Sequence, residues 1–304
     1  MSPMIKCPVC NKEDTIELFK KEGWIFVQCR KDRLVYINPQ PEREELQGIY
    51  NTYGKEIYIL PESIAAIGDY PDYRKRFFDF RDTNRLLEIG AAAGGFLVRC
   101  RKDGWDTYGV DFSGPSSQFA RDKQGLNVFT GTLLDAQYPD NFFDVILAWQ
   151  TLEHVPNPRE VVEEVWRILR PGGFWVLSVP RWEGLSIRLL NKKYRYVGRD
   201  HLFYFSSDNM VQMLTHVGFS DVRTRTAGFN PIVCYQDLRG FIKTSSTVGC
   251  QKGLQAEKIM KRWGKNHLLR TIHIIYSKTI EAFDLGDTLF AEGVKPISPS
   301  YKVF

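Results

Sequence analysis

The sequence predicts an α/β fold built on a doubly wound, mostly parallel sheet. From residue 84 to residue 226, short apolar runs alternate with amphipathic segments of helical length, a pattern typical of βαβ units with right-handed crossovers. The first apolar run, 86–89, stops at the glycine-rich turn 90–95, and the acidic residue Asp111 follows some twenty residues later. Because ligands of such sheets bind outside the carboxyl ends of the strands, we expect a ligand at this turn.

The individual elements follow from apolar runs, helical periodicity, capping residues and chain breakers. For example, Ser206 and its neighbours cap an amphipathic helix that Gly218 closes. After Pro180, residues 181–204 are rich in basic and aromatic side chains, and no regular element is expected there. We expect strands at 84–90, 106–111, 126–130, 143–148, 173–179 and 219–226, and helices at 94–102, 115–124, 158–169 and 206–218.

The turn at 90–95 fits an adenosine-containing cofactor because small residues let the backbone approach a ligand and the following helix offers free N–H groups. One interpretation is a dinucleotide-binding fingerprint formed by Gly90, Ala92 and Gly95, in which Ala92 replaces the central glycine. Asp111 then lies at the spacing expected for the acid that binds the ribose of NAD.

The same stretch also resembles the class I S-adenosylmethionine-dependent methyltransferases. Their first two motifs are an acidic residue followed by Gly-x-Gly-x-Gly, and then an acid at the end of the next strand. Glu88, Gly90 and Gly94 with Asp111 match this pattern, although Ala92 again replaces the central glycine. The turn alone therefore does not decide between the two cofactors.

Later segments favour the methyltransferase reading. Residues 131–135, 144–155 and 169–174 resemble three further motifs of that family, in the family's order and spacing. An NAD-dependent oxidoreductase would need a second mononucleotide-binding half after this point, and none is visible. The resemblance covers roughly residues 82–225. It implies a seven-stranded Rossmann-like sheet whose last strand, 288–294, is antiparallel and inserted between the fifth and sixth.

The resemblance also implies roles for residues at the carboxyl ends of the strands. Glu88 would fix the binding turn, Asp111 would hold the ribose, and Asp135 would accept the amino group of adenine. Phe112 would cover one face of adenine. The implied cofactor-binding residues are Glu88, Gly90, Ala92, Gly94, Asp111, Phe112, Leu134, Asp135, Trp149 and Gln150.

Two histidines are candidate general bases. His154 follows the fourth strand, and His201 lies in the loop after the fifth. Transfer of a methyl group to a hydroxyl or a carbon acid is helped by a base that removes the acceptor's proton. A structural role is the alternative for each. If the amino-terminal flap covers the cofactor, as it does in the family, Tyr50 or Tyr53 would reach the methionine end.

The amino terminus carries a candidate metal site. Cys7 and Cys10 form a C-x-x-C knuckle, and Cys29 begins a second knuckle in which Asp32 stands where a fourth cysteine would be. Strands are expected at 24–27 and 34–37, so the layout is that of a zinc ribbon. Carboxylate is a less common structural ligand than thiolate. Zinc binding is expected, and a ribbon that has lost its metal is the alternative.

The domain organisation follows from these segments. Residues 1–38 are the ribbon-like segment, 39–81 an aromatic helical flap, and 82–304 the methyltransferase domain. That domain includes a substrate loop at 181–205 and a helical insertion at 237–283. The insertion is expected to pack on the domain, and the alternative is contact of 258–283 with a membrane surface that carries a lipid-linked substrate.

Composition narrows the function. The 304 residues carry a net charge of +5, spread along the chain, so no nucleic-acid partner is expected. Neither a signal peptide nor a membrane span is recognisable, which indicates a cytoplasmic protein. We expect a methyltransferase that modifies an oxygen or carbon of a small molecule or a sugar or glycan-type intermediate. The alternatives are an NAD-dependent oxidoreductase and a non-enzymatic binding module with a vestigial cofactor fold.

Overall fold

The computed structural model describes residues 4–66, 71–198, 200–240, 253, 255, 256 and 267–297. The chain divides into two compact units. The core unit contains residues 43–178, 210–223 and those from 291 onward, and the appended unit contains the residues up to 42, 179–209 and 224–290.

The large sheet has seven strands in the order β10-β11-β8-β7-β4-β5-β6. Strands β4 to β8 pair in parallel with one another, and β11 lies between β8 and β10 as the one antiparallel strand. The expected fold class is therefore confirmed. The strands are β4 (Arg85–Ile89), β5 (Asp106–Asp111), β6 (Asn127–Thr130), β7 (Phe143–Trp149), β8 (Leu169–Pro180), β10 (Ser220–Ala227) and β11 (Thr288–Val294).

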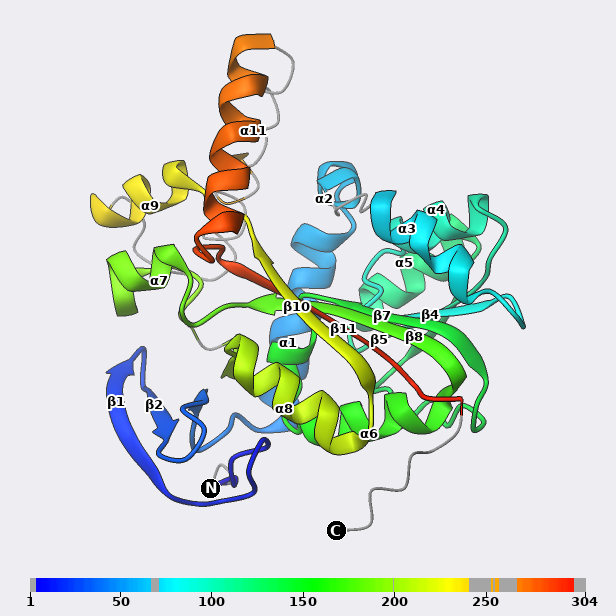
Figure 1. Cartoon of the computed structure of the whole chain (residues 1–304), viewed down its shortest axis with the longest axis horizontal. Coiled ribbons are helices and arrows are strands. Elements are labelled where there is room, and N and C mark those ends of the chain that lie inside the picture. Colours follow the sequence, from blue (N-terminus) through cyan, green and yellow to red (C-terminus); the bar gives the residue numbers. More distant parts are fainter. Residues whose placement is uncertain are drawn as a thin grey trace. The chain divides into compact units, whose positions relative to one another are not determined.

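Helices follow the strands as the alternating pattern predicts (Figure 1). Strand β7 is buried along its length up to Trp149, as its continuous apolar sequence requires. Before β4, the flap consists of short helical pieces that carry the aromatic side chains. The helices are α1 (Arg43–Tyr53), η1 (Gly54–Tyr58), α2 (Pro61–Ala66), α3 (Pro71–Phe77), η2 (Phe78–Phe80), α4 (Gly95–Lys102), α5 (Gly114–Gln124), η3 (Leu152–His154), α6 (Pro158–Ile168) and α8 (Ser207–Val217).

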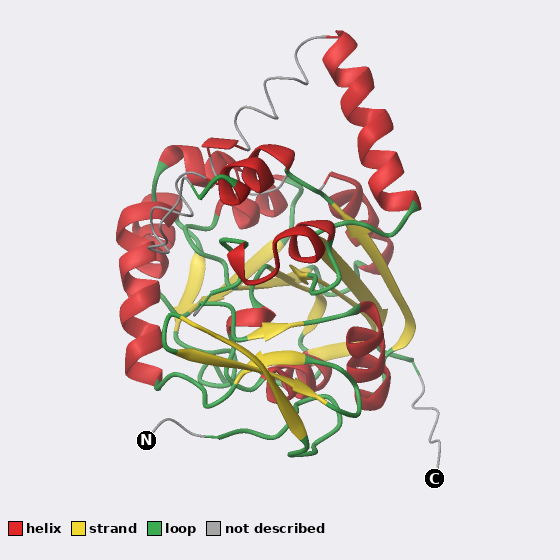
Figure 2. Cartoon of the chain, turned by 90° about the vertical axis from the view of Figure 1, so that its left-hand side faces the viewer, coloured by secondary structure: helices red, strands yellow, loops and turns green. Residues whose placement is uncertain are grey.

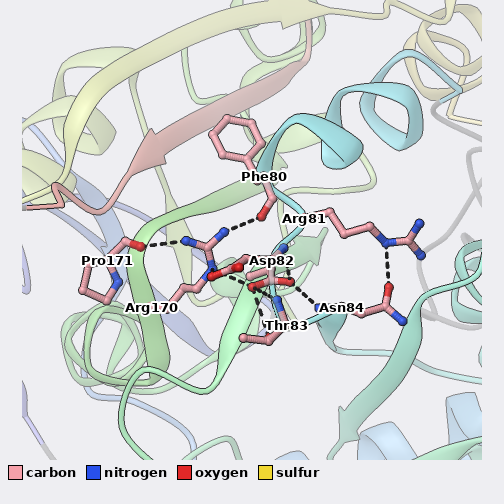
Figure 3. Close-up of polar contacts among 8 residues, drawn as sticks. Phe80, Arg81, Asp82, Thr83, Asn84, Arg170 and Pro171 are labelled. Atoms are coloured by element: carbon pink, nitrogen blue, oxygen red, sulfur yellow. Dashed lines mark hydrogen bonds and ion pairs between the residues drawn. The ribbon is translucent and has the colours of Figure 1, made fainter.

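A buried carboxylate joins the amino ends of three central strands. Asp144, fully buried in β7, accepts backbone N–H groups of Asp82, Thr83 and Asn84 at 3.0, 3.1 and 2.6 Å. Arg170 in β8 donates its Nε to Asp144 at 2.6 Å and its Nη2 to the carbonyl of Phe80 at 2.6 Å. Figure 3 shows the guanidinium of Arg170 reaching into the turn that precedes β4. This network fixes where β4 starts, at the opposite end from its glycine turn.

The appended unit contains a four-stranded sheet in the order β1-β2-β3-β9. The expected hairpin is present, with Phe26 opposite Ile37 and Val27 opposite Tyr36. Strand β9 comes from the segment 181–205 and pairs with β3. The expectation that this segment lacks regular structure was wrong, because it also contains α7 and η4. The strands are β1 (Thr15–Lys21), β2 (Trp24–Cys29), β3 (Val35–Ile37) and β9 (Phe203–Tyr204), and the helical elements are α7 (Leu185–Leu190), η4 (Asn191–Lys193), α9 (Pro231–Leu238) and α11 (His267–Ala282).

The expected helical insertion at 237–283 is described only in part, because residues 241–252, 254 and 257–266 lie outside the described residues. Its carboxyl-terminal part is α11, a long helix whose lower end in Figure 2 leads through a loop into β11. Among the residues described, none of the helices combines the length and hydropathy needed to cross a bilayer.

Candidate functional site

The turn after β4 has the backbone that its glycines permit. Gly90 and Gly94 adopt φ angles of 74° and 77°, in the left-handed region where glycine carries no steric penalty. A Cβ atom at Gly90 would lie 2.2 Å from Oγ1 of Thr151, so no larger residue fits. Ala92, at the central position of the family pattern, also has a positive φ, 46°. The alanine therefore keeps the glycine-like backbone of the motif.

Asp111 closes this turn from the end of β5. Its Oδ2 accepts the N–H of Ala92 at 2.7 Å, and its Oδ1 accepts the N–H of Ser113 at 2.8 Å. Burial raises the pKa of Asp111 to about 6, while these two N–H groups oppose the shift. An ionised carboxylate has about four acceptor positions, so two remain for other donors. The side chain is thus held in a fixed orientation and can still accept a pair of hydroxyl groups.

Glu88 lies one residue before the end of β4 and is buried. Burial, and next the charge of Asp111, raise its pKa well above the ordinary value. Within the described part of the chain, Oε2 of Glu88 has no hydrogen-bond partner. A buried polar atom in this state normally faces a water molecule or a ligand. Glu88 and Asp111 are therefore two buried acids of one site, and the charge of Asp111 disfavours ionisation of Glu88.

Helix α1 covers the side of the site where adenosine is expected. Nη2 of Arg43 lies 3.1 Å from Oδ2 of Asp135, and its guanidinium lies 5.7 Å from the ring centroid of Phe112. Oδ1 of Asn51 accepts the N–H of Gly114 at 3.1 Å. Arg43 and Asn51 were missed by the sequence analysis. The only feature of the sequence that could have indicated them is that both lie in the helix expected before the cofactor motifs.

His154 joins this site, and Tyr50 is its neighbour. The Tyr50 ring centroid lies 5.6 Å from that of His154 and 6.3 Å from that of Phe112. Nε2 of His154 lies 3.7 Å from Oε1 of the buried Glu153. Tyr53 is buried and packs against Tyr50. Of the two tyrosines expected near the cofactor, Tyr50 is therefore the one between the adenine side and the histidine.

The remaining candidates at the site have different surroundings. The Trp149 ring packs against Tyr73 and Phe96, at centroid distances of 5.5 and 5.8 Å. The side chain of Gln150 donates to Oγ of Ser178 at 3.2 Å. Leu134, next to Asp135, is 43% exposed and available to an adenine ring.

His201 belongs to the appended unit. It is buried, its ring is stacked on that of Tyr196 at 6.4 Å, and burial lowers its pKa. A histidine held neutral by burial retains a basic nitrogen at neutral pH. Its surroundings within the unit are nevertheless those of a packed aromatic side chain.

The amino-terminal knuckles bring together the four expected metal ligands. One ligand atom from each of Cys7, Cys10, Cys29 and Asp32 lies within 4.8 Å of the others. Sγ of Cys7 is 3.2 Å from Oδ2 of Asp32, and Sγ of Cys10 is 3.5 Å from Sγ of Cys29. A zinc ion with bonds of about 2.3 Å to sulfur would place tetrahedral ligands about 3.7 Å apart. The donor set and its spacing fit zinc.

The two knuckles have the same turn geometry. Asn11 donates its N–H to the carbonyl of Cys7, and Arg33 donates its N–H to that of Cys29. Both donors have a positive φ, 59° and 63°. The second knuckle therefore keeps the cysteine-knuckle backbone with an aspartate in the last ligand position. Close by, the hydroxyl of Tyr36 is buried with no hydrogen-bond partner among the described residues, and burial followed by the charge of Cys7 raises its pKa.

Comparison with known proteins identifies the core unit. A family model described as a methyltransferase domain matches residues 64–224, more than half of the chain. A fatty-acid O-methyltransferase of Mycolicibacterium smegmatis is 27% identical over 51% of this chain and 59% of its own length. A demethylmenaquinone methyltransferase of Paenarthrobacter aurescens is 23% identical over 55% of this chain and 76% of its own.

Solved structures share the fold. A SAM-dependent methyltransferase from Thermotoga maritima, titled a possible histamine N-methyltransferase, superimposes with a TM-score of 0.53 at 19% identity, over 82% of this chain and 99% of that one. The matches to the first curated relatives span between 43% and 70% of those proteins' lengths. The family match decides between the two cofactors that the turn at 90–95 fits. This chain belongs to the methyltransferase family and is a class I S-adenosylmethionine-dependent methyltransferase.

Proposed function

We propose that this enzyme transfers a methyl group to an oxygen or carbon of a small molecule or a glycan-type intermediate. Among the relatives named for their acceptor atom, a fatty-acid O-methyltransferase and a ubiquinone/menaquinone biosynthesis C-methyltransferase support this choice. A phosphoethanolamine N-methyltransferase also matches the chain, and nitrogen is therefore the acceptor that the test below must exclude. The observation that carries the site is the orientation of Asp111 by two backbone N–H groups at the end of β5.

Each residue of the site has a distinct task. S-adenosylmethionine, when bound, supplies a methyl group on a sulfonium whose leaving group is already activated. Asp111 accepts the ribose hydroxyls, and Asp135, fixed by Arg43, accepts the amino group of adenine. Phe112 covers one face of adenine, and Gly90 and Gly94 give the turn the left-handed backbone with which it approaches the methionine portion. Alignment of the acceptor atom is then the protein's main contribution.

His154 is the proposed base. A hydroxyl or carbon acid must lose a proton during methylation, and His154 lies beside Tyr50, at the side of the cofactor site. The buried Glu153 next to its Nε2 would stabilise the imidazolium that forms. His201 remains a second candidate in the appended unit.

The direct test of the proposal is a pair of calorimetric titrations. S-adenosylhomocysteine is expected to bind the protein and NAD is not, because Asp111 and Asp135 would serve one nucleoside and the described part of the chain contains no second mononucleotide-binding half. Incubation with methyl-labelled S-adenosylmethionine and fractionated small-molecule extracts should then label a small molecule. Treatment of the labelled compound with acid and with base then distinguishes a methyl group on carbon, which is not released, from one on oxygen. Binding of NAD alone would contradict the proposal.

We also propose that Cys7, Cys10, Cys29 and Asp32 hold a structural zinc ion. Thiolate ligands persist in a reducing compartment, which agrees with the cytoplasmic location that we propose. In the appended unit the zinc would tie the turn before β1 to the turn between β2 and β3. Its contribution would be to stability, since a site with four protein ligands leaves no open position for chemistry.

Zinc analysis of variants is expected to support this assignment. Wild-type protein should contain about one zinc ion per chain, and Cys29→Ser should lose it and melt at a lower temperature. Cys100→Ser is the matched control, because Cys100 is also a buried free thiol but lies in α4 of the core unit. It should keep the full zinc content. Asp32→Cys should bind zinc more tightly, because thiolate is the softer ligand.

The alternative, a ribbon that folds without metal, predicts a different result. Protein prepared with added zinc would then hold no stoichiometric metal, and a chelator would leave its melting temperature unchanged. Either finding would remove the zinc proposal without affecting the cofactor site.

A further inference from the structure

Two neighbouring helices of the appended unit expose large apolar side chains. Helices α7 and α9 contact one another, and Oγ of Ser186 lies 3.1 Å from Sγ of Cys234 between them. Leu189 of α7 and Tyr235 and Leu238 of α9 are 63%, 55% and 65% exposed. Figure 1 labels both helices near the long helix α11 of the same unit. Single exposed apolar residues are common, but a group of three on two short helices indicates a binding surface.

The exposed charged residues of α7 and η4 are basic, namely Arg188, Lys192 and Lys193. Arg239, also exposed, directly follows α9, and the exposed acid Glu183 lies two residues before α7. The guanidinium of Arg239 lies 5.6 Å from the ring centroid of Tyr235. We call the three apolar and four basic residues together the basic-apolar surface.

Among the described residues, the acids near the basic-apolar surface are held mainly by other arginines. Asp237 of α9 is buried and accepts a hydrogen bond from Nε of Arg195 at 2.9 Å. Asp284 and Glu183 pair with Arg181 at 2.5 and 3.3 Å, and the charge of Arg188 also helps to lower the pKa of Asp284. Lys192, Lys193 and Arg239 are exposed.

Helix α11 adds exposed apolar side chains to this part of the appended unit. Ile272 and Ile275, three residues apart and so on one side of the helix, are 50% and 62% exposed, and Phe283 just beyond its end is 72% exposed. The hydroxyl of Tyr276 donates to the carbonyl of Phe229 at 2.9 Å, which attaches α11 to the residues just before α9. The three helices thus form one continuous part of the appended unit.

We propose that the basic-apolar surface binds the surface of an anionic lipid bilayer. Short basic segments with exposed leucine and tyrosine lie in the interface, where cations contact lipid phosphates and apolar side chains enter the acyl boundary. A second copy of this chain does not fit, because a two-fold contact would place four cations against four cations. Nucleic acid would match the cations but leave the three apolar side chains without a partner.

This assignment goes beyond the methyl acceptor proposed above and does not depend on it. Binding to the bilayer would bring the enzyme to substrates that are dissolved in or attached to the membrane. Membrane contact of 258–283 was the alternative to packing of that insertion on the domain. The surface proposed here shares only α11 with that segment, because its main residues are in α7 and η4 and in and directly after α9, and residues 258–266 lie outside the described residues.

Co-sedimentation of the full chain with vesicles tests the proposal. Vesicles of phosphatidylcholine with about one-quarter phosphatidylglycerol should bind the protein, and pure phosphatidylcholine should bind it far less, because each cation near an anionic surface strengthens binding about fivefold. Lys192→Ala/Lys193→Ala should therefore weaken partitioning about 30-fold. Lys102→Ala/Lys123→Ala removes the same charge from exposed positions of the core unit and should change it little.

The apolar contribution is tested separately. Leu189→Ser/Leu238→Ser should weaken partitioning about 10-fold or more at unchanged charge. The proposal is overturned if the wild type does not bind anionic vesicles, if the core-unit control loses as much binding as Lys192→Ala/Lys193→Ala, or if the serine variant binds like the wild type. Loss of a dimer in the serine variant would assign the surface to self-association instead. S-adenosylhomocysteine titrated into the same samples reports the cofactor site independently.

Discussion

Replacement of Asp111 by alanine is expected to weaken the binding of S-adenosylhomocysteine by about a hundredfold to ten-thousandfold. The carboxylate is oriented by the N–H groups of Ala92 and Ser113 and has acceptor positions left for two ribose hydroxyls. Hydrogen bonds to a charged group contribute about 1.5 to 3 kcal/mol each, and each 1.4 kcal/mol is a factor of ten in affinity. Isothermal titration calorimetry of the variant and the wild type measures the loss.

Two further variants separate this effect from a general loss of structure. Asp106→Ala removes an exposed carboxylate from the opposite end of the same strand and should keep the wild-type affinity. His154→Ala should also bind S-adenosylhomocysteine nearly as well, while turnover falls about 100-fold or more if this histidine is the base. Wild-type affinity in a folded Asp111→Ala protein would show that the ribose is held elsewhere.

The pKa of Asp111 adds a pH dependence. Burial raises that pKa from 3.8 to about 6, so the carboxyl group becomes protonated as pH falls through about 6 and loses acceptor positions. Affinity for S-adenosylhomocysteine should therefore fall below this pH. Between the two pKa values the folded state binds more protons than the unfolded state, and the contribution of Asp111 to stability decreases as pH rises through that window. At neutral pH, removal of this buried charge offsets part of the cost of unpairing the two N–H groups, so stability should change little.

The sheet and the cofactor turn were predictable because their signals are local. A buried parallel strand is a continuous apolar run, and a left-handed turn requires glycine, so β4, Gly90 and Gly94 are visible in one short stretch. Strand β11, expected at 288–294, has these bounds in the structure. Its place between β8 and β10 came from the family resemblance and is confirmed.

What was missed depends on contacts between residues distant in the sequence. Arg43 and Asp135 are 92 residues apart, and nothing in the sequence around Arg43 indicates its partner. Strand β1 alternates poorly, because Glu17 and Leu18 are exposed next to each other and Lys20 is exposed as well, so its pairing with β2 was not recognisable. Strand β9 has two residues, too few for any periodic pattern, and exists because β3 offers it a partner.

Replacement of Asp144 by alanine is expected to destabilise the protein by about 3–5 kcal/mol, the range found when one partner of a buried ion pair is removed. The variant leaves the N–H groups of Asp82, Thr83 and Asn84 without their acceptor and leaves Arg170 beside an exposed carboxylate, Asp82, 3.6 Å away. Urea unfolding followed by circular dichroism measures the change.

The matched control for this prediction is Asp140→Ala. Asp140 pairs with Arg167 at an exposed position, and such a pair contributes less than about 1 kcal/mol.

Burial acts to raise the pKa of Asp144, but the N–H groups and Arg170 outweigh it, and the pKa lies below 3.8. Ionised Asp144 therefore contributes its full stabilisation at pH values above 3.8, the pKa of the unfolded state. This stabilisation is lost as the pH falls through the lower pKa of the folded state. The difference in the free energy of unfolding between the wild type and Asp144→Ala should be constant near neutral pH and should become smaller in acid. Because the network lies at the amino ends of β4 and β7, the folded variant should still bind S-adenosylhomocysteine normally, and a stability loss no larger than that of Asp140→Ala would contradict the role assigned to Asp144.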